Sequence, residues 1–155
     1  MPAFVIAAED PATPDIAALV ASHLREMHAC SPACKVHAMP AARLAESDVI
    51  MFAARVDGEL AAIGALKALG PLEGEIKSMR AADAFRGTGA GRAILAHILA
   101  EARARGLCWI GLETGRHPVF ASAQRLYAAN GFRECPPFAG YVSDDFSLCM
   151  GLPLA

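Results

Sequence analysis

Apolar residues recur at helical spacing in two long stretches of the chain. The first runs from Thr13 to about Ala29 and opens with a hydroxyl cap, a proline at the first helical position and an acid in the first turn. The second runs from Gly91 to Arg105, where the apolar side chains form one stripe and Gly106 stands where a helix would end. The pattern therefore predicts two amphipathic helices.

Shorter segments predict a third helix and a set of strands. The third helix runs from about Val119 to Asn130 and is closed by Gly131. Short apolar runs between turn residues predict strands at Val49–Val56, Leu60–Leu66, Glu75–Ala81, Leu107–Glu113, Phe132–Cys135 and Ser147–Leu152. The first two strands are joined across Asp57-Gly58, which suits a hairpin turn. We expect Ser31–Pro40 to be a loop and Ala41–Glu46 a short helix.

The order of these elements predicts the fold class. A strand, a glycine-rich turn, a helix and a strand follow one another from Glu75 to Glu113, as in a βαβ unit. The remaining strands are close enough to pair as antiparallel neighbours. We therefore expect an α/β (α+β) fold with a mixed, mostly antiparallel central sheet flanked by helices. A chain of 155 residues is the usual size of one domain, so residues 1–155 are expected to form a single domain.

Charge and composition limit the kind of partner. The chain has 14 Lys+Arg against 16 Asp+Glu, so it lacks the basic surface that nucleic acids and anionic membranes require. No apolar run approaches the roughly 18 residues of a membrane span, and the first residues lack a cationic leader segment. Five cysteines without a regular framework indicate cytoplasmic thiols, and Cys108 and Cys149, in apolar strands, are expected to be buried and inert. We expect a cytoplasmic protein with no nucleic-acid or membrane partner.

The segment RGTGAGR, residues 86–92, carries the strongest chemical signal. Three glycines at alternate positions allow a tight turn that gathers backbone N–H groups, and the N-terminus of the following helix favours negative charge. The arginines at either end can add charge-assisted hydrogen bonds. The predicted phosphate-binding residues are Arg86, Gly87, Thr88, Gly89, Ala90, Gly91 and Arg92.

The spacing of the glycines decides between phosphate ligands. A nucleotide P-loop needs a lysine and a hydroxyl residue after its last glycine, whereas Arg92-Ala93 stands here. A dinucleotide fingerprint needs glycines at offsets of two and then three, which this turn lacks. Glu113 does stand about twenty residues on, where the ribose-binding acid would be, so an NAD-binding enzyme remains an alternative. A plain strand-to-helix turn without a ligand is the other alternative.

Two motifs together resemble the GNAT superfamily of N-acetyltransferases. Its acetyl-CoA signature, Arg/Gln-x-x-Gly-x-Gly/Ala after a strand, is matched at Arg86, Gly89 and Gly91. Further on, LYAANGF at 126–132 matches the family's Leu-Tyr followed three residues later by Gly-Phe. The order of the predicted elements is also similar to the family's fold. One difference is Phe120, where many members have an asparagine that contacts the cofactor.

The resemblance implies acetyl transfer from acetyl-CoA to a primary amine by direct attack in a ternary complex. It places the pyrophosphate on the backbone of residues 87–92 and the pantetheine along the strand that holds Met79 and Ala81. No metal is required. The resemblance says little about the acceptor. The loop Ser31–Pro40 and the Tyr141 loop could enclose a pocket sized for a small amine, so a small-molecule or amino-acid-like acceptor is favoured, with a protein N-terminus or lysine side chain as the alternative. A homodimer would be in keeping with the family. The alternative is a module that binds acyl-CoA without turnover.

Three residues are candidates for the chemistry of transfer. The resemblance makes Tyr127 the acid that protonates the leaving thiolate, although it also lies on the same helix face as Phe120 and could be a core residue. Glu75 and Glu113 are candidate bases, because each lies at the end of a strand that could border a cleft. The alternative is that both are ordinary exposed acids.

A histidine and cysteine cluster lies at the end of the first helix. His28, Cys30, Cys34 and His37 are residue types that zinc accepts, but they lack the usual gap between ligand pairs. We expect a helix end and loop beside the acceptor pocket there, and no metal.

Overall fold

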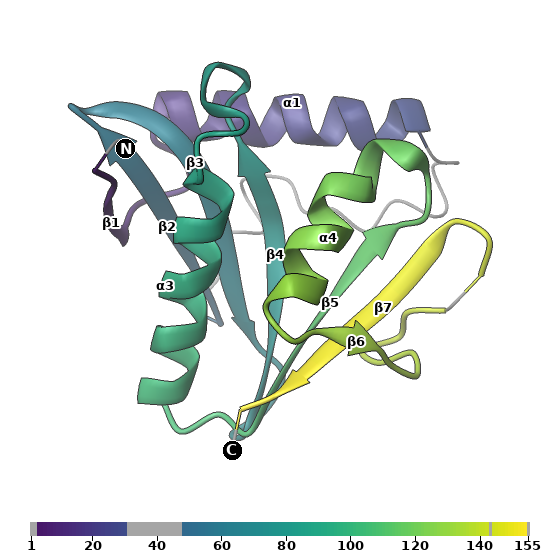
Figure 1. Ribbon diagram of the computed structural model, residues 1–155. Helices are drawn as coiled ribbons and strands as arrows, with labels where there is room; N and C mark the ends of the chain where they lie inside the picture. Colours follow the sequence, from purple (N-terminus) through teal and green to yellow (C-terminus); the bar gives the residue numbers. More distant parts are fainter. Residues whose placement is uncertain (1–2, 31–47, 143, 155) are drawn as a thin grey trace.

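Seven strands form one sheet in the order β1-β2-β3-β4-β5-β7-β6 (Figure 1). The computed structural model describes residues 3–30, 48–142 and 144–154. The strands are β1 Val5–Ala8, β2 Val49–Val56, β3 Glu59–Ala68, β4 Glu73–Ala81, β5 Trp109–Gly115, β6 Arg133–Glu134 and β7 Ser147–Pro153. Every neighbouring pair is antiparallel except β4 and β5, which are parallel. The predicted mixed, mostly antiparallel sheet is confirmed.

The helices lie on both faces of this sheet. They are α1 Pro14–Cys30, α3 Ala90–Ala104 and α4 Ala121–Ala129, with short 3-10 turns η2 Asp83–Phe85 and η3 Pro118–Phe120. In Figure 1, α3 and α4 cover the near face and α1 crosses behind the upper end of the sheet. The loop and short helix expected at Ser31–Pro40 and Ala41–Glu46 lie outside the described residues.

Two apolar clusters hold the layers together. The stripe predicted on the second long helix is buried as the face of α3 that packs on the sheet, with Ile94, Leu95, Ile98, Leu99 and Ala102. On the other face, Ile16 and Val20 of α1 pack against β2 and β3. The approach of α3 is close at Gly64 of β3, because a Cβ there would lie 2.6 Å from Cγ2 of Ile94. The close packing on β3 thus depends on a residue without a side chain.

The parallel strands β4 and β5 pair over a short length and then separate. Their register joins Glu73 to Trp109, Gly74 to Ile110 and Glu75 to Gly111, and no later pair of the two strands is hydrogen bonded within the described residues. Figure 1 shows the two strands diverging toward their carboxyl ends. Sheet neighbours that separate leave backbone groups of both strands available to a ligand.

A bulge marks β4 just beyond the point of separation. The register with β3 passes from Ala65 opposite Lys77 to Ile63 opposite Arg80, so the β4 strand carries one extra residue. Ser78 lies in this bulge with a φ of 56°, a conformation that residues with a Cβ seldom adopt. The bulge therefore redirects the last residues of β4, where the sequence placed the cofactor-binding strand.

Two details differ from the sequence prediction. The strand β1 was not foreseen, because its four residues are largely exposed and their apolar pattern is not that of a buried strand; pairing with β2 forms it. The prediction that Cys108 is buried is wrong: Cys108 is exposed, since β5 begins one residue later at Trp109. Cys149 on β7 is buried, as expected. No described helix is long and apolar enough to cross a membrane.

Candidate active site

The glycine-rich turn joins the end of β4 to α3. Gly87 and Gly89 have φ values of 75° and 90°, and Gly89 is the N-cap residue of the helix. Only glycine adopts this left-handed backbone without strain, so the local sequence dictates the turn. A Cβ at either position would meet nothing within 4 Å, so these two glycines serve backbone conformation and leave open space beside the turn.

The start of α3 presents backbone donors to that space. The first hydrogen bond of the helix is donated by the Ala93 N–H to the carbonyl of Gly89 at 3.0 Å, so the N–H groups of residues 90–92 have no partner inside the helix. No side-chain hydrogen bond caps Gly89 in the described structure. Donors without a cap, at the positive end of a 15-residue helix, form a site that fits an anionic group such as a pyrophosphate.

The two arginines of the turn are placed differently from the glycines. The Arg86 guanidinium is half exposed and pairs with Asp83 at 3.2 Å and with Glu26 of α1 at 3.6 Å. Glu26 also accepts a hydrogen bond of 2.6 Å from Arg80 of β4, and this partner holds the pKa of the Glu26 carboxyl below the usual range. Arg92 is exposed on α3. The turn is thus tied to α1 and β4 through one carboxylate.

The predicted pantetheine-binding residues lie on the strand side of the turn. Met79 packs into the core against α3, and its sulfur lies 2.6 Å from where a Cβ on Gly64 would be. Ala81 ends β4 opposite Ala62 of β3. On the opposite side of the strand, β4 has no hydrogen-bonded neighbour beyond Glu75 among the described residues. An extended chain with amide groups could pair there as an additional strand.

Tyr127 is a buried residue of α4. Its exposed fraction is 6%, it belongs to the core cluster under α3, and its ring meets that of Phe132 edge to face at 5.8 Å. Burial raises the pKa of the phenol above its ordinary value. The hydroxyl is therefore protonated at neutral pH and can donate a hydrogen bond. The ring packs in the core, as expected if Tyr127 is a core residue.

Glu75 is the most deeply buried carboxylate of the site. It lies on β4 with an exposed fraction of 2%, in contrast to the alternative of an exposed strand-end acid. The Nζ of Lys77 donates a hydrogen bond of 3.1 Å to its Oε2, and the hydroxyl of Tyr141 donates another to the same oxygen. Lys77 also donates to the Tyr141 hydroxyl. We call Glu75, Lys77 and Tyr141 the buried triad.

Glu113 lies near the buried triad on β5. Ile110 and Leu112 of that strand face the core under α3, so Glu113 points to the opposite face, as Glu75 does next to Ile76. Burial raises the pKa of Glu113 to about 7; a hydrogen bond from Ser147 and the charge of Lys77 oppose the rise, and the negative charges of Glu75 and Asp144 add to it. A carboxyl with a pKa near 7 can exchange protons at neutral pH.

Aromatic rings adjoin the buried triad. Trp109 meets Phe138 edge to face at 5.0 Å, and Phe138 meets Tyr141 at 5.4 Å. The Nζ of Lys77 lies 5.2 Å from the centre of the Tyr141 ring. The segment between β6 and β7 therefore contributes Tyr141, a member of the triad, and Phe138, which packs beside it. The sequence indicated only that the Tyr141 loop could form a pocket wall; it gave no signal for the part played by Lys77, because a lysine in a strand usually faces solvent.

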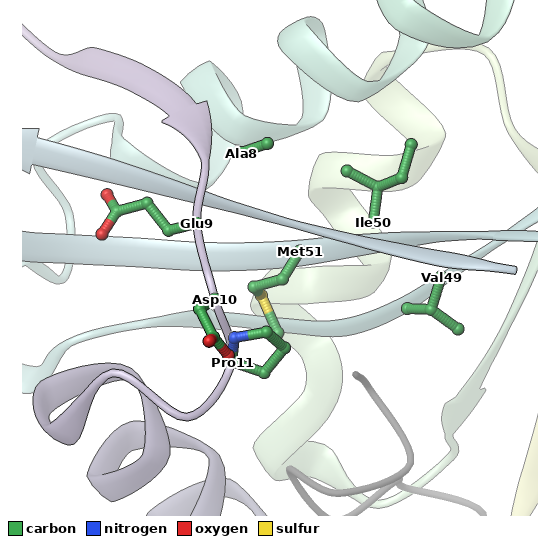
Figure 2. A pocket seen from close by; sticks show the side chains of 7 residues that line it. All are labelled: Ala8, Glu9, Asp10, Pro11, Val49, Ile50 and Met51. Atoms are coloured by element: carbon green, nitrogen blue, oxygen red, sulfur yellow. The ribbon is translucent and has the colours of Figure 1, made fainter. Parts of the chain in front are cut away.

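Other features lie apart from these groups. A groove of about 430 Å³ at the far edge of the sheet is lined by Ala8, Glu9, Asp10, Pro11, Val49, Ile50 and Met51 (Figure 2). It lies on β1 and β2, whereas the carboxylates lie on β4 and β5, and its Glu9 is paired with Arg55 at 2.9 Å.

The side chains of the predicted histidine and cysteine cluster, His28, Cys30, Cys34 and His37, lie outside the described part of the structure. Among the residues that are described, no group of three His, Cys, Asp or Glu side chains could hold a metal ion.

Comparison with known proteins settles the family. Residues 16–132 match the model of the Acetyltransferase (GNAT) family, and this region includes both motifs and the parallel strand pair. The chain belongs to the GNAT family of acetyltransferases. It is similar to the uncharacterized N-acetyltransferase YedL of Escherichia coli, with 38% identity covering 97% of this chain and 95% of that one. GNAT enzymes use acetyl-CoA, and the match covers β4, the glycine-rich turn, β5 and Tyr127, whereas Tyr141 and Ser147 lie beyond its end.

Two further relatives extend the comparison. An IAA acetyltransferase of Azospirillum brasilense is 34% identical, covering 99% of this chain and all of the relative. The crystal structure of an acyl-CoA N-acyltransferase of Klebsiella pneumoniae has a TM-score of 0.79 and 29% identity, covering 98% of each chain. The GNAT fold and an acyltransferase activity in enzyme class 2.3.1 follow for this chain.

Proposed function

We propose that this GNAT enzyme transfers the acetyl group of acetyl-CoA to the primary amine of a small molecule. The observation that carries the proposal is the separation of β4 from β5 beside an uncapped helix N-terminus. An anionic head on the turn and an extended arm along β4 would bring a thioester into the gap between the strands. The IAA acetyltransferase of Azospirillum brasilense, named for a small-molecule substrate, supports a small acceptor over a protein.

The candidate acid and the candidate bases lie on opposite faces of the sheet. Tyr127 belongs to the core on the α3 face, whereas Glu75 and Glu113 point to the opposite face. An acid on one side of the thioester and a carboxylate on the other match the two proton transfers of the reaction. This division also suits a ternary complex, in which the acceptor enters from the face opposite to α3.

The proposed reaction balances as follows. A carboxylate takes one proton from the acceptor ammonium, and the freed nitrogen lone pair attacks the thioester carbonyl carbon to form a C–N bond. The C–S bond then breaks, the leaving thiolate takes the proton of the Tyr127 hydroxyl, and the nitrogen gives up its second proton, which restores the phenol. The products are an amide, free CoA and one proton released from the carboxylate to solvent.

A library of amines, assayed for free thiol with acetyl-CoA as donor, tests the proposal. We expect thiol release above the rate of hydrolysis with at least one class of small primary amine, together with a new amide in the product. A protein that binds acetyl-CoA but releases no thiol with any amine would be a sensing module. Stabilisation against heat by NAD, and none by CoA, would instead support the dinucleotide alternative.

A further inference from the structure

The two carboxylates of the site have different partners, and the difference assigns them different roles. We propose that Glu75 is the fixed counter-ion of Lys77, that Glu113 is the base that takes the proton of the acceptor ammonium, and that Lys77 is the positioning residue that separates the two roles. The inference rests on the proposed function, because it specifies which carboxylate serves the amine.

The carboxylate of Glu75 is bound within the buried triad. Its side chain is 3% exposed and that of Lys77 is 10% exposed, so both charges are largely removed from water. Lys77 and Tyr141 both donate to the Oε2 atom of Glu75. Protonation of Glu75 would leave the ammonium of Lys77 buried without its counter-ion, which is strongly unfavourable. Glu75 is therefore held as the counter-ion of Lys77 and is poorly placed to take the proton of the acceptor.

Glu113 has no ion pair of this kind among the described residues. Its hydrogen bond comes from the neutral Ser147 hydroxyl, and its side chain is partly exposed. The charged and titratable groups around it are Glu75 and Lys77 on β4, Tyr141 and Asp144 between β6 and β7, and Cys149 on β7. Taking up a proton here breaks no ion pair, and the pKa of about 7 makes both forms of Glu113 accessible near neutral pH.

Lys77 controls the balance through its charge. Its ammonium lowers the pKa of Glu113, while the carboxylate of Glu75 raises it. Removing the charge of Lys77 should therefore raise the pKa of Glu113, and removing the charge of Glu75 should lower it. A residue that merely supported the fold would lower the rate without moving the pH profile, so the sign of the shift distinguishes the two roles.

The test is the pH dependence of kcat/KM for the best amine found in the library. In the wild type, the rate should rise with pH through a limb near pH 7 as Glu113 loses its proton. E113Q should lower kcat/KM by about 10²-fold or more and abolish that limb. K77M should move the limb to higher pH by about one unit, and E75Q should move it to lower pH. E73Q, which removes an exposed carboxylate from the same strand, should leave it in place.

Two further measurements keep the inference falsifiable. K77M can unfold the chain by leaving Glu75 unpaired, so the double variant E75Q/K77M, which removes both charges, should fold and return the limb toward its wild-type position. Carbon-13 NMR titration of the Glu113 carboxyl should show the same shifts without substrate. If E75Q loses activity while E113Q keeps it, or if K77M and E75Q shift the limb in the same direction, the inference is wrong. If the wild type acetylates no amine, the proposed function fails instead.

Discussion

At the scale of single residues, burial separates what the sequence could and could not predict. The Leu-Tyr match identified Tyr127, but the structure adds that its hydroxyl is desolvated and its ring packs against Phe132. Glu75 and Glu113 were equivalent candidates as letters in a sequence. Their difference arises from the partners of Glu75. Lys77 lies two positions from Glu75 along the chain, and Tyr141 lies 66 positions from it. The contact with Tyr141 is set by tertiary packing, which no local pattern contains.

The role assigned to Tyr127 predicts a separation between turnover and binding. Tyr127→Phe removes the hydroxyl and keeps the ring, so acetyl-CoA should bind with unchanged Kd while kcat falls by about 10²-fold. Steady-state kinetics measure kcat, and calorimetric titration with acetyl-CoA in the absence of an amine measures Kd. An unchanged kcat would mean that another group protonates the thiolate and that Tyr127 is a core residue only.

At the scale of elements, the turn between β4 and α3 was the most predictable part of the site. Its glycines specify a positive φ at Gly87 and Gly89, and the apolar stripe that follows specifies which face of α3 is buried. Both are local signals, written within about twenty residues. The separation of β4 from β5 was anticipated only in outline, because β5 also pairs with β7 along its whole length and β4 carries a bulge at Ser78.

Two glycines of this segment, Gly89 and Gly91, should respond differently to substitution by alanine. Gly89→Ala forces a Cβ onto a residue with a φ of 90°, which should cost about 1–2 kcal/mol in the free energy of unfolding and weaken binding of acetyl-CoA. Gly91 lies inside α3 without a positive φ, and a Cβ there would make an ordinary contact of 3.6 Å with Leu126. Gly91→Ala should therefore raise stability by up to roughly 1 kcal/mol and leave binding intact. Urea unfolding and calorimetric titration compare the pair; equal effects of the two changes would contradict the account.

At the scale of the whole molecule, charged side chains join the helix on one face to the central strands. Glu26 of α1 binds Arg80 of β4 and Arg86 of the turn, and His23 lies close enough to feel both Arg80 and Glu26. The sequence predicted α1 as an amphipathic helix but could not predict this pairing, since the partners lie more than fifty residues apart. These ion pairs therefore contribute both to the stability of the fold and to the position of the glycine-rich turn.

His23 predicts how stability changes with pH. Burial, and then the charge of Arg80, lower the pKa of His23 from 6.5 to about 4, so the unfolded chain takes up a proton before the folded one does. Its contribution to stability is therefore complete above pH 6.5 and is lost as the pH falls toward 4, by about 2 kcal/mol at pH 5. Urea unfolding at pH 7 and pH 5 should show that His23→Gln loses less stability on acidification than the wild type. Equal losses would contradict a His23 that is neutral in the folded protein.

The central claim is that the backbone at the start of α3 holds the pyrophosphate of acetyl-CoA and so directs the thioester into the gap between β4 and β5. A crystal structure of the complex with acetyl-CoA tests this most directly. We expect pyrophosphate oxygens within hydrogen-bond distance of N–H groups of residues 87–92, and the thioester between the two strands. A complex with the pyrophosphate bound elsewhere and these N–H groups facing solvent would contradict it.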